Sequence, residues 1–274
     1  MRILAIVVTY YPEKELLESN VSAFVDEVDK VLIWENTLPK EKSDYRFIHH
    51  EKVEYCGDGV NSISHGLNFG WQYAKDNGYD YLLTMDQDSL LEDFVSMKHY
   101  AEKHRQEKII LGPSLNKGKD DISRNHVATK VENMITSGML LSVEVLDVLG
   151  GYDERLAIDG LDTDLSYRAQ SHDIQLYRLE DCNMIQRFGE PVVRTFCGKE
   201  YHISVYSPSR LRSIIKSHVY LIRKYKNMSR DVKRYIVRHY IVDKTKEIIL
   251  FENQKMRKLF SLYYGIFEGL LVRR

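Results

Sequence analysis

Two clusters of acidic residues stand out as groups that could do chemistry. The first is Asp86-Gln87-Asp88-Ser89, which directly follows the apolar run at residues 81–85. Two carboxylates at the end of a strand present hard oxygen ligands to Mg²⁺ or Mn²⁺, and a metal held there could bind the phosphates of a nucleotide. An ordinary turn, in which Asp side chains accept hydrogen bonds from nearby amides, gives the same pattern.

The second cluster places Asp159, Asp162 and Asp164 within six residues, four residues ahead of Arg168. Asp162 or Asp164 could simply cap a following helix, whose positive N-terminal end would keep the carboxylate ionised. Three neighbouring carboxylates repel one another unless a cation or substrate hydroxyls compensate, which favours a functional role.

A smaller feature lies between these two clusters. Ser137-Gly138 combines a small side chain with a glycine, so that backbone and ligand could approach closely there. An ordinary strand start would look the same.

The apolar pattern predicts the elements that must position these groups. Residues 3–9 form a continuous β-branched run typical of a buried strand, and a helical stripe from about residue 13 leads to a second run at 31–34. Helices near 61–77 and 92–105 then alternate with strands near 81–85, 109–111 and 139–141. We therefore expect an α/β fold with one open, mostly parallel sheet and ligands beyond the carboxyl ends of its strands.

The C-terminal part differs in pattern and in charge. After about residue 205 the strand signals disappear, and helical spacing continues to residue 272. We therefore expect an α/β domain at 1–205 and a helical region at 206–274. The net charge of −1 hides a strong asymmetry, because residues 210–274 carry 17 Lys and Arg against 5 Asp and Glu. The basic part could face an anionic partner such as a membrane surface or nucleic acid.

Composition narrows the class of protein. With 274 residues and 43% hydrophobic residues the chain is globular, and its 3 cysteines form no C-x-x-C pair, so neither a zinc site nor a disulfide framework is indicated. The sequence shows no secretory signal pattern and no run of about 18 apolar residues that would predict a membrane span. We expect a protein of the reducing cytoplasm.

Eight short segments follow one another in a characteristic order. They are residues 7–12 (VVTYYP), 34–37 (WENT), 65–70 (HGLNFG), 85–89 (MDQDS), 137–139 (SGM), 150–154 (GGYDE), 158–164 (IDGLDTD) and 187–190 (RFGE). Each is common alone, but the ordered set resembles the family 2 glycosyltransferases of the GT-A fold, and most of all their bacterial rhamnosyltransferase branch. The resemblance covers about residues 3–225. It implies a Rossmann-like sheet with helices on both faces, followed by the helical extension.

The resemblance also implies a role for each motif. Asp162 aligns with the general base that deprotonates the acceptor hydroxyl, and Asp86 and Asp88 align with the pair that holds Mg²⁺ or Mn²⁺ on the donor diphosphate. The residues implied in nucleotide-sugar binding are Thr9, Tyr10, Glu35, Asn36, Asn68, Asp86 and Gln87. Those implied in positioning the acceptor or sugar are Ser137, Gly138, Asp159, Asp164 and Arg168.

The chain departs from the family's pattern at several positions. Family members usually have Asn at Tyr11, Asp at Glu35, and Arg-Asn at Lys216-Ser217. They commonly carry a metal-binding His where this chain has Gln186, whose amide oxygen is a poorer, neutral ligand. We consider His202 as a substitute ligand, against the reading of a purely structural histidine.

The basic C-terminal helices suggest where the enzyme works. Their Lys and Arg residues alternate with aromatic residues, namely Tyr235, Tyr240, Phe251, Phe260, Tyr263, Tyr264 and Phe267. This pattern suits peripheral contact with an anionic membrane at the inner face of the cell membrane, although a solvated basic face over an ordinary core would look similar. Nucleic acid is not expected, because the acidic α/β domain would repel phosphates and no recognised nucleic-acid motif is present.

The preferred hypothesis is a metal-dependent, inverting glycosyltransferase of surface polysaccharide biosynthesis. By resemblance its donor would be a nucleoside-diphosphate sugar, dTDP-rhamnose, and its acceptor a saccharide or a lipid-linked saccharide. A haloacid-dehalogenase-type phosphatase is one alternative, because strand-Asp-x-Asp-Ser is also the nucleophile loop of that class. A non-catalytic module that binds sugar nucleotides or glycans is the other, suggested by Gln186.

Overall fold

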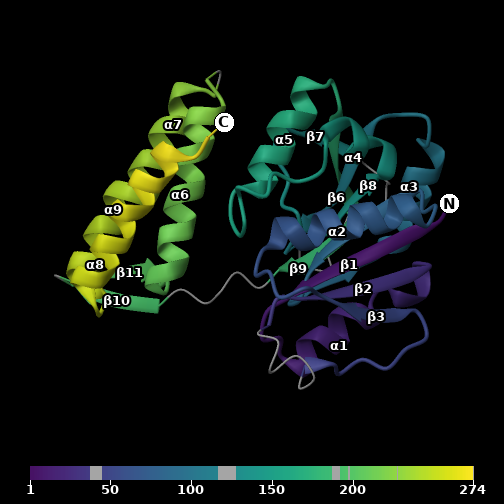
Figure 1. Cartoon of the computed structure of the whole chain (residues 1–274), viewed down its shortest axis with the longest axis horizontal. Helices are drawn as coiled ribbons and strands as arrows, with labels where there is room; N and C mark the ends of the chain where they lie inside the picture. The colour runs from purple at the N-terminus through teal and green to yellow at the C-terminus, as the bar shows by residue number, and fades with distance from the viewer. Residues whose placement is uncertain (38–44, 117–127, 187–191, 197, 227, 274) are drawn as a thin grey trace. The chain divides into compact units, whose positions relative to one another are not determined.

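The computed structural model describes residues 1–37, 45–116, 128–186, 192–196, 198–226 and 228–273, which form two compact units (Figure 1). The first comprises the described residues up to 157 and from 161 to 186, and the second comprises residues 158–160 and the described residues from 192 onward. A hairpin at 192–203 thus groups with the C-terminal helices, whereas the sequence prediction places it before a boundary near residue 205. The Arg-Phe-Gly-Glu segment at 187–190 lies outside the described residues.

The first unit is built on one large sheet. Among the described residues it has the order β3-β2-β1-β4-β8-β6-β9-β5, and β7 also pairs with β9. The strands are β1 (Ile3–Thr9), β2 (Lys30–Glu35), β3 (Val53–Cys56), β4 (Tyr81–Asp86), β5 (Ser89–Glu92), β6 (Ile109–Leu115), β7 (Ala128–Val131), β8 (Met139–Ser142) and β9 (Gln175–Gln186).

The half of the sheet that contains β1 is purely parallel. β1 pairs with both β2 and β4, and β2 pairs with β3, all in parallel register. Antiparallel pairs enter beyond β4, where β8 lies between β4 and β6, and where β7 and β5 pair with successive parts of β9. The predicted α/β class with an open sheet is confirmed.

Helices cover both faces of this sheet because the strands are apolar on both sides. They are α1 (Lys14–Ser22), α2 (Ile63–Asp76), α3 (Phe94–Lys103), α4 (Val143–Leu149) and α5 (Leu161–Ser171), with a short 3₁₀ turn η1 (Val25–Glu27). Successive side chains of β1 point to opposite faces. Ile3, Ala5 and Val7 pack in the core that includes α1 and α3, whereas Ile6 lies against Gly70 of α2.

The second unit contains a hairpin and a group of helices. Its elements are β10 (Val192–Phe196), β11 (Lys199–Ile203), α6 (Pro208–Lys224), α7 (Arg230–Ile236), a π-helical stretch η4 (Val237–Asp243), α8 (Lys244–Phe251) and α9 (Lys255–Leu271). Its small apolar core consists of Leu211, Ile215, Val219, Ile248 and Leu262. Ser207 caps α6 by accepting a hydrogen bond from the Arg210 amide. In the described part of the chain, no helix combines the length and apolarity needed to cross a bilayer.

Close packing of α2 on the sheet gives a test of this fold. A Cβ at Gly66 would lie 2.5 Å from Cδ1 of the buried Trp34. We expect Gly66→Ala to lower the free energy of unfolding by about 1–3 kcal/mol, because the clash outweighs the better helix propensity of Ala, which is worth about 1 kcal/mol. Urea unfolding measures the difference, with Gln72→Ala on the exposed face of α2 as the control. A Gly66→Ala protein as stable as the wild type would contradict this packing.

Candidate active site

The ends of β1 and β4 meet at one edge of the sheet, as predicted. Val8 lies opposite Asp86 in the parallel register of these strands. The residues that follow are tied together, because the Tyr10 amide donates to Gln87 Oε1 over 2.6 Å and Gln87 Nε2 donates to the Tyr10 carbonyl over 3.3 Å. Thr9 is buried, and its hydroxyl donates to the Trp34 carbonyl. The Tyr10 side chain, 50% exposed, presents a ring surface at this edge.

The end of β2 joins the same edge, but its polar side chains are already engaged. Glu35 is 2% exposed and accepts from Arg46 Nη2 over 2.8 Å. This hydrogen bond raises the pKa of Arg46. Asn36 Oδ1 accepts from the Trp34 indole over 3.0 Å, and the Asn36 amide donates to the Thr9 carbonyl. Glu35 and Asn36 therefore expose little surface at this edge.

A closed ring of hydrogen bonds holds Asp86 at the end of β4. The Asp86 amide donates to Ser137 Oγ, and Ser137 Oγ donates to Ser89 Oγ, over 3.0 and 3.1 Å. Ser89 Oγ donates to Gln186 Oε1 over 3.0 Å, and Gln186 Nε2 donates to Asp86 Oδ2 over 3.2 Å. Both serines are buried. The ring joins three parts of the chain that are far apart in the sequence, and it brings Ser137 and Gln186 to Asp86.

One further residue at this edge carries no signal in the sequence. Asn20 on α1 is buried, and its Nδ2 donates to the Asp86 carbonyl oxygen over 2.5 Å. A lone Asn in an amphipathic helix is an ordinary observation, so only the folded chain reveals this contact.

The oxygen ligands available for a divalent cation are the carboxylates of Asp86 and Asp88, which fit the hard-ligand chemistry of Mg²⁺ or Mn²⁺. Across the described ranges, no group of three or more His, Cys, Asp or Glu residues could hold a metal ion by itself. Gln186 turns its amide N–H toward Asp86 and its oxygen toward Ser89, so in this arrangement it is a hydrogen-bond partner of the carboxylate. His202 lies exposed on β11 in the second unit.

Helix α5 carries the second acidic cluster. Asp162 is half-buried in the first turn, and its Oδ1 accepts from the Thr163 amide over 2.7 Å. Asp164 is fully buried and pairs with Arg168 Nε over 2.8 Å. Arg168 Nη1 also donates to the carbonyl oxygens of Leu149 and Gly151. Asp164 and Arg168 thus fix the end of α4 to α5, instead of facing solvent as acceptor-positioning residues would.

A single loop connects the surroundings of Asp162 and Asp86. In the loop at residues 132–138, the Met134 amide donates to Ser166 Oγ on α5. Four residues on, Gly138 takes a left-handed φ of 79°, and its amide donates to the Thr84 carbonyl on β4. Because Ser137 in the same loop contacts Asp86, one short segment links the helix of the expected base to the strand of the expected metal ligands.

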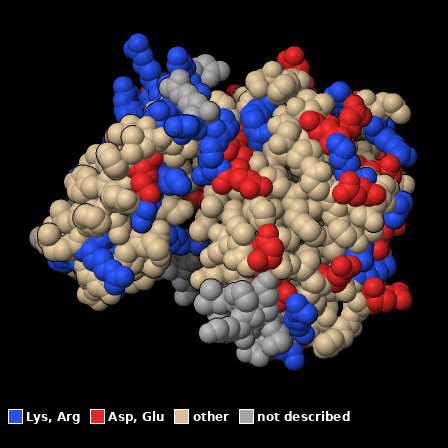
Figure 2. All heavy atoms as spheres, viewed as in Figure 1, with Lys and Arg blue, Asp and Glu red and all other residues tan. Residues whose placement is uncertain are grey.

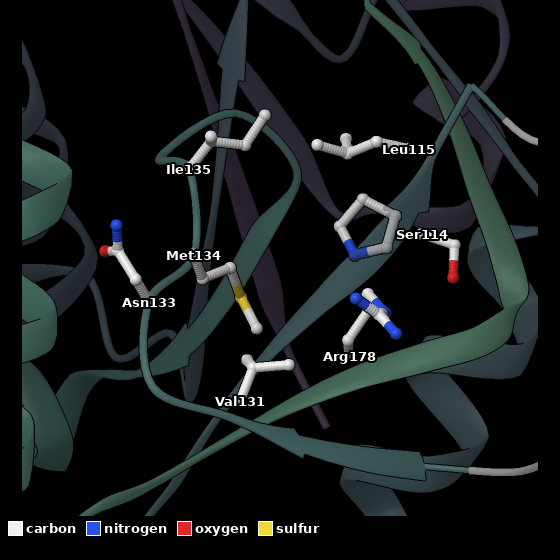
Figure 3. A pocket seen from close by; sticks show the side chains of 8 residues that line it. Ser114, Leu115, Val131, Asn133, Met134, Ile135 and Arg178 are labelled. Carbon is white, nitrogen blue, oxygen red and sulfur yellow. The ribbon is translucent and has the colours of Figure 1, made fainter.

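The same loop lines a cavity of about 350 Å³ (Figure 3). Val131, Met134 and Ile135 lie on one side of it, and Ser114, Leu115 and Arg178 lie on the other. None of the predicted site residues is among those that line it. The cavity therefore shares the loop at residues 132–138 with the expected site, but it is not the expected site itself.

Of the two remaining predicted residues, Asn68 binds the backbone of a neighbouring loop, and Asp159 lies in the second unit. Asn68 on α2 pairs with the backbone of Tyr152 in both directions, through Oδ1 over 2.7 Å and Nδ2 over 2.9 Å. This pairing fixes the loop after Gly151, so Asn68 acts on the backbone in this structure. Asp159 belongs to the second unit, where the next residue, Gly160, lies against Leu221 of α6.

A histidine between two carboxylates is a feature that the sequence prediction missed. His65 Nε2 lies 2.8 Å from Asp58, and its Nδ1 lies 3.3 Å from Glu154. The hydrogen bond to Asp58 is the main cause that raises the pKa of His65. Glu154 also accepts from Asn68 Nδ2, so this cluster connects α2 to the loop before α5.

Comparison with known proteins decides the class of the chain. No model of a known protein family matches it. Over 244 residues it is 25% identical to the dTDP-rhamnosyl transferase RfbF of Shigella flexneri, covering 81% of this chain and 80% of that protein. It is also similar in structure to GalNAc-T7 with UDP, GalNAc and Mn²⁺, with a TM-score of 0.64, 11% identity and 98% of this chain covered. The chain spans 56% of the GalNAc-T7 chain.

A second solved structure agrees. Residues 1–349 of S. aureus TarS in complex with UDP-GlcNAc match with a TM-score of 0.56 and 12% identity, covering 98% of this chain and 82% of that one. The chain is a GT-A glycosyltransferase. The predicted GT-A fold, the resemblance to rhamnosyltransferases and the nucleotide-sugar glycosyltransferase class are confirmed. The phosphatase alternative is not favoured, because in the described part of the chain β1, β2 and β3 precede β4, whereas the nucleophile loop of that class follows the first strand. The binding-module alternative is likewise not favoured.

The cluster around His65 predicts a pH dependence of stability. Folding raises the pKa of His65, so the protonated imidazole stabilises the folded state. This stabilisation is complete below the pKa of His65 in the unfolded chain, about 6.5, and is lost as the pH rises through the higher pKa of the folded chain. We expect His65→Gln to flatten this fall in melting temperature, measured from about pH 5 to about pH 9. The control is His99→Gln, a change at an exposed position of α3. An unchanged pH profile in His65→Gln would refute the role given to the pair of carboxylates.

Proposed function

We propose that this glycosyltransferase transfers rhamnose from dTDP-rhamnose to a saccharide or lipid-linked acceptor, with inversion, in the synthesis of a surface polysaccharide. The observation that carries the proposal is the similarity to the Shigella rhamnosyltransferase across about four fifths of both chains. Support for a nucleotide-sugar donor comes from the TarS structure, whose bound ligand is UDP-GlcNAc.

The nucleoside would lie on the edge formed by the ends of β1 and β2. The exposed ring of Tyr10 is the surface on which a base could stack, since aromatic side chains bind flat ring systems through their faces. Buried Thr9, Glu35 and Asn36 would shape the floor beneath it, and Gln87 would hold the Tyr10 backbone in place. Asn68 would affect donor binding indirectly, because it fixes the backbone of Tyr152.

Asp86 and Asp88 would hold Mg²⁺ or Mn²⁺ beside the donor diphosphate. When bound, such a cation offsets the negative charge that grows on the leaving diphosphate. The role of the protein itself would be to orient the two carboxylates. The Gln186 amide and the Ser137 hydroxyl hold Asp86, so little rearrangement of its side chain is needed when the donor arrives.

Asp162 would act as the general base. Its position in the first turn of α5 favours the ionised carboxylate, because the N-terminal end of a helix carries positive potential. As the acceptor oxygen bonds to the anomeric carbon, the bond from that carbon to the diphosphate breaks on the opposite face, and the acceptor proton passes to Asp162. Ser137 and Gly138 would position the sugar or acceptor, whereas Asp164 and Arg168 would hold α5 in place.

Replacing the base tests this assignment. Asp162→Asn should lower the rate of sugar transfer by about 10²–10⁴-fold, because the amide cannot accept the proton, while dTDP binding stays close to that of the wild type. Transfer is measured with labelled donor and binding by calorimetry. Asp147→Asn, which changes a carboxylate that pairs with Lys75 and Trp71, is the control and should keep full activity. Full transfer by Asp162→Asn would remove Asp162 as the base.

A thermal-shift screen tests the donor and the metal together. Ligands that bind only the folded chain raise its melting temperature according to concentration and affinity. We expect dTDP with Mn²⁺ to stabilise the chain more than UDP or GDP with Mn²⁺, and Asp88→Asn to remove most of the effect of Mn²⁺. Equal stabilisation by all three nucleotides would argue against dTDP, and a shift by dTDP that is independent of Mn²⁺ would argue against the metal role.

We place the reaction at the inner face of the cell membrane, where a lipid-linked saccharide would be within reach. The basic charge of residues 210–274, a net +12 from 17 Lys and Arg against 5 Asp and Glu, supports contact with anionic lipid.

A further inference from the structure

Helix α9 has a buried face and an exposed apolar face that point in opposite directions. The inner face consists of Lys258, Leu262, Gly265 and Gly269, which are buried. A second set is spaced by alternating steps of four and three residues, and we call it the outer stripe: Met256, Phe260, Tyr263, Phe267 and Leu270. Met256, Phe260, Tyr263 and Phe267 each lie two residues from an inner position, which is a rotation of about 200° around the helix.

The inner face is committed to α6. A Cβ at Gly265 would lie 2.7 Å from the carbonyl oxygen of Arg212, and one at Gly269 would lie 2.7 Å from the carbonyl oxygen of Lys216. The backbones of α6 and α9 therefore approach closely, and only glycine fits at these two positions. Because the inner face is closed in this way, α9 cannot turn its outer stripe inward without losing this packing.

The outer stripe is exposed along the whole helix. The exposed fractions are 81% for Met256, 70% for Phe260, 57% for Tyr263, 57% for Phe267 and 52% for Leu270. Tyr264, beside the stripe, stacks on Phe260 with ring centroids 5.8 Å apart and lies 6.3 Å from Phe267. A contiguous row of large apolar side chains of this kind marks an interaction surface.

Charge indicates what this surface would contact. Lys255 and Arg257 at the start of α9 and Arg273 after its end are all exposed. In Figure 2 the surface of the C-terminal helices is mainly tan, with groups of Lys and Arg atoms at its upper and lower ends and a smaller group of acidic and basic atoms between them. A second copy of the chain would bring two surfaces of the same positive sign together, and such like charges repel. An anionic bilayer instead attracts the basic residues and accepts the aromatic row at the level of its head groups.

We propose that α9 lies in the surface of an anionic membrane, with its outer stripe inserted among the lipids and its flanking Lys and Arg residues on the phosphate groups. This inference rests on the proposed function in one respect, because a lipid-linked acceptor gives the contact its purpose. The inference goes beyond the proposed function because it names the face of α9 that contacts the membrane. Tyr240, which the sequence pattern includes among the membrane-facing aromatics, is instead half-buried and stacks on the buried His218, with ring centroids 3.6 Å apart.

Co-sedimentation of the full chain with vesicles tests the proposal. The wild type should bind vesicles of phosphatidylcholine mixed with phosphatidylglycerol and should bind pure phosphatidylcholine vesicles weakly. Phe260→Ser/Phe267→Ser should weaken binding to the mixed vesicles by at least about tenfold, because the inserted apolar area is lost. Val95→Ser/Val148→Ser removes two exposed valines of the first unit and should bind like the wild type.

A second variant does not depend on the aromatic residues. Lys255→Glu/Arg257→Glu keeps the outer stripe, changes only exposed side chains, and should also lose about tenfold in binding to the mixed vesicles. Wild-type binding by both double variants would overturn the proposal. So would a dimer in sedimentation velocity that Phe260→Ser/Phe267→Ser converts to a monomer while the wild type ignores vesicles, because the stripe would then pair two copies.

The donor is measured separately, so the two proposals can fail independently. Stabilisation by dTDP and Mn²⁺ should be the same in the wild type and in Phe260→Ser/Phe267→Ser, because no residue of α9 belongs to the proposed donor site. Vesicle binding without any nucleotide stabilisation would refute the proposed donor and leave the membrane surface standing. Nucleotide stabilisation without vesicle binding would refute the membrane surface alone.

Discussion

The parallel pairing of β1 with both β2 and β4 is the constraint on which the site depends. In this register Thr9 lies opposite Glu35, and Val8 lies opposite Asp86, so the three strands end at one edge. A slip of one residue in either pairing would turn the side chains of that strand to the other face of the sheet. Close packing on both faces opposes such a slip, because every residue of β1 is buried and Ile6 fits closely against Gly70 of α2. The core of the first unit thus determines which polar side chains meet.

The ring around Asp86 shows how a polar site is built into that edge. Ser89 and Ser137 are nearly inaccessible to solvent, so their hydroxyl groups must be satisfied within the protein. They satisfy each other and connect Gln186 to the amide and carboxylate of Asp86. In a buried ring of this kind each bond supports the next, which holds the carboxylate before any ligand binds. Gln186 therefore has a clear structural use at a position where the family's pattern has a histidine.

The sequence predicts the elements well, because buried strands and amphipathic helices have distinct periodicities, and it predicts that Asp86 follows a strand. It does not predict which polar side chains have partners. Asp164 and Asp162 have equivalent positions in the sequence pattern, yet Asp164 is buried against Arg168, while Asp162 is half-exposed. Asn68 binds the backbone of a loop 84 residues away. Such pairings depend on long-range geometry, which local spacing does not encode, so the roles of individual residues are harder to predict than the fold.

The contacts of Arg168 have a consequence for motion. This side chain donates to two carbonyl groups at the end of α4 and pairs with Asp164 inside α5, so the two helices are joined at residues 149–168. Where loops close over a substrate, the hinge residues absorb large changes in backbone angles. A hinge at residues 149–151 or 164–168 would break these contacts, including a buried ion pair. A closing movement would therefore pivot outside these two segments and leave the α5 backbone that carries Asp162 in place.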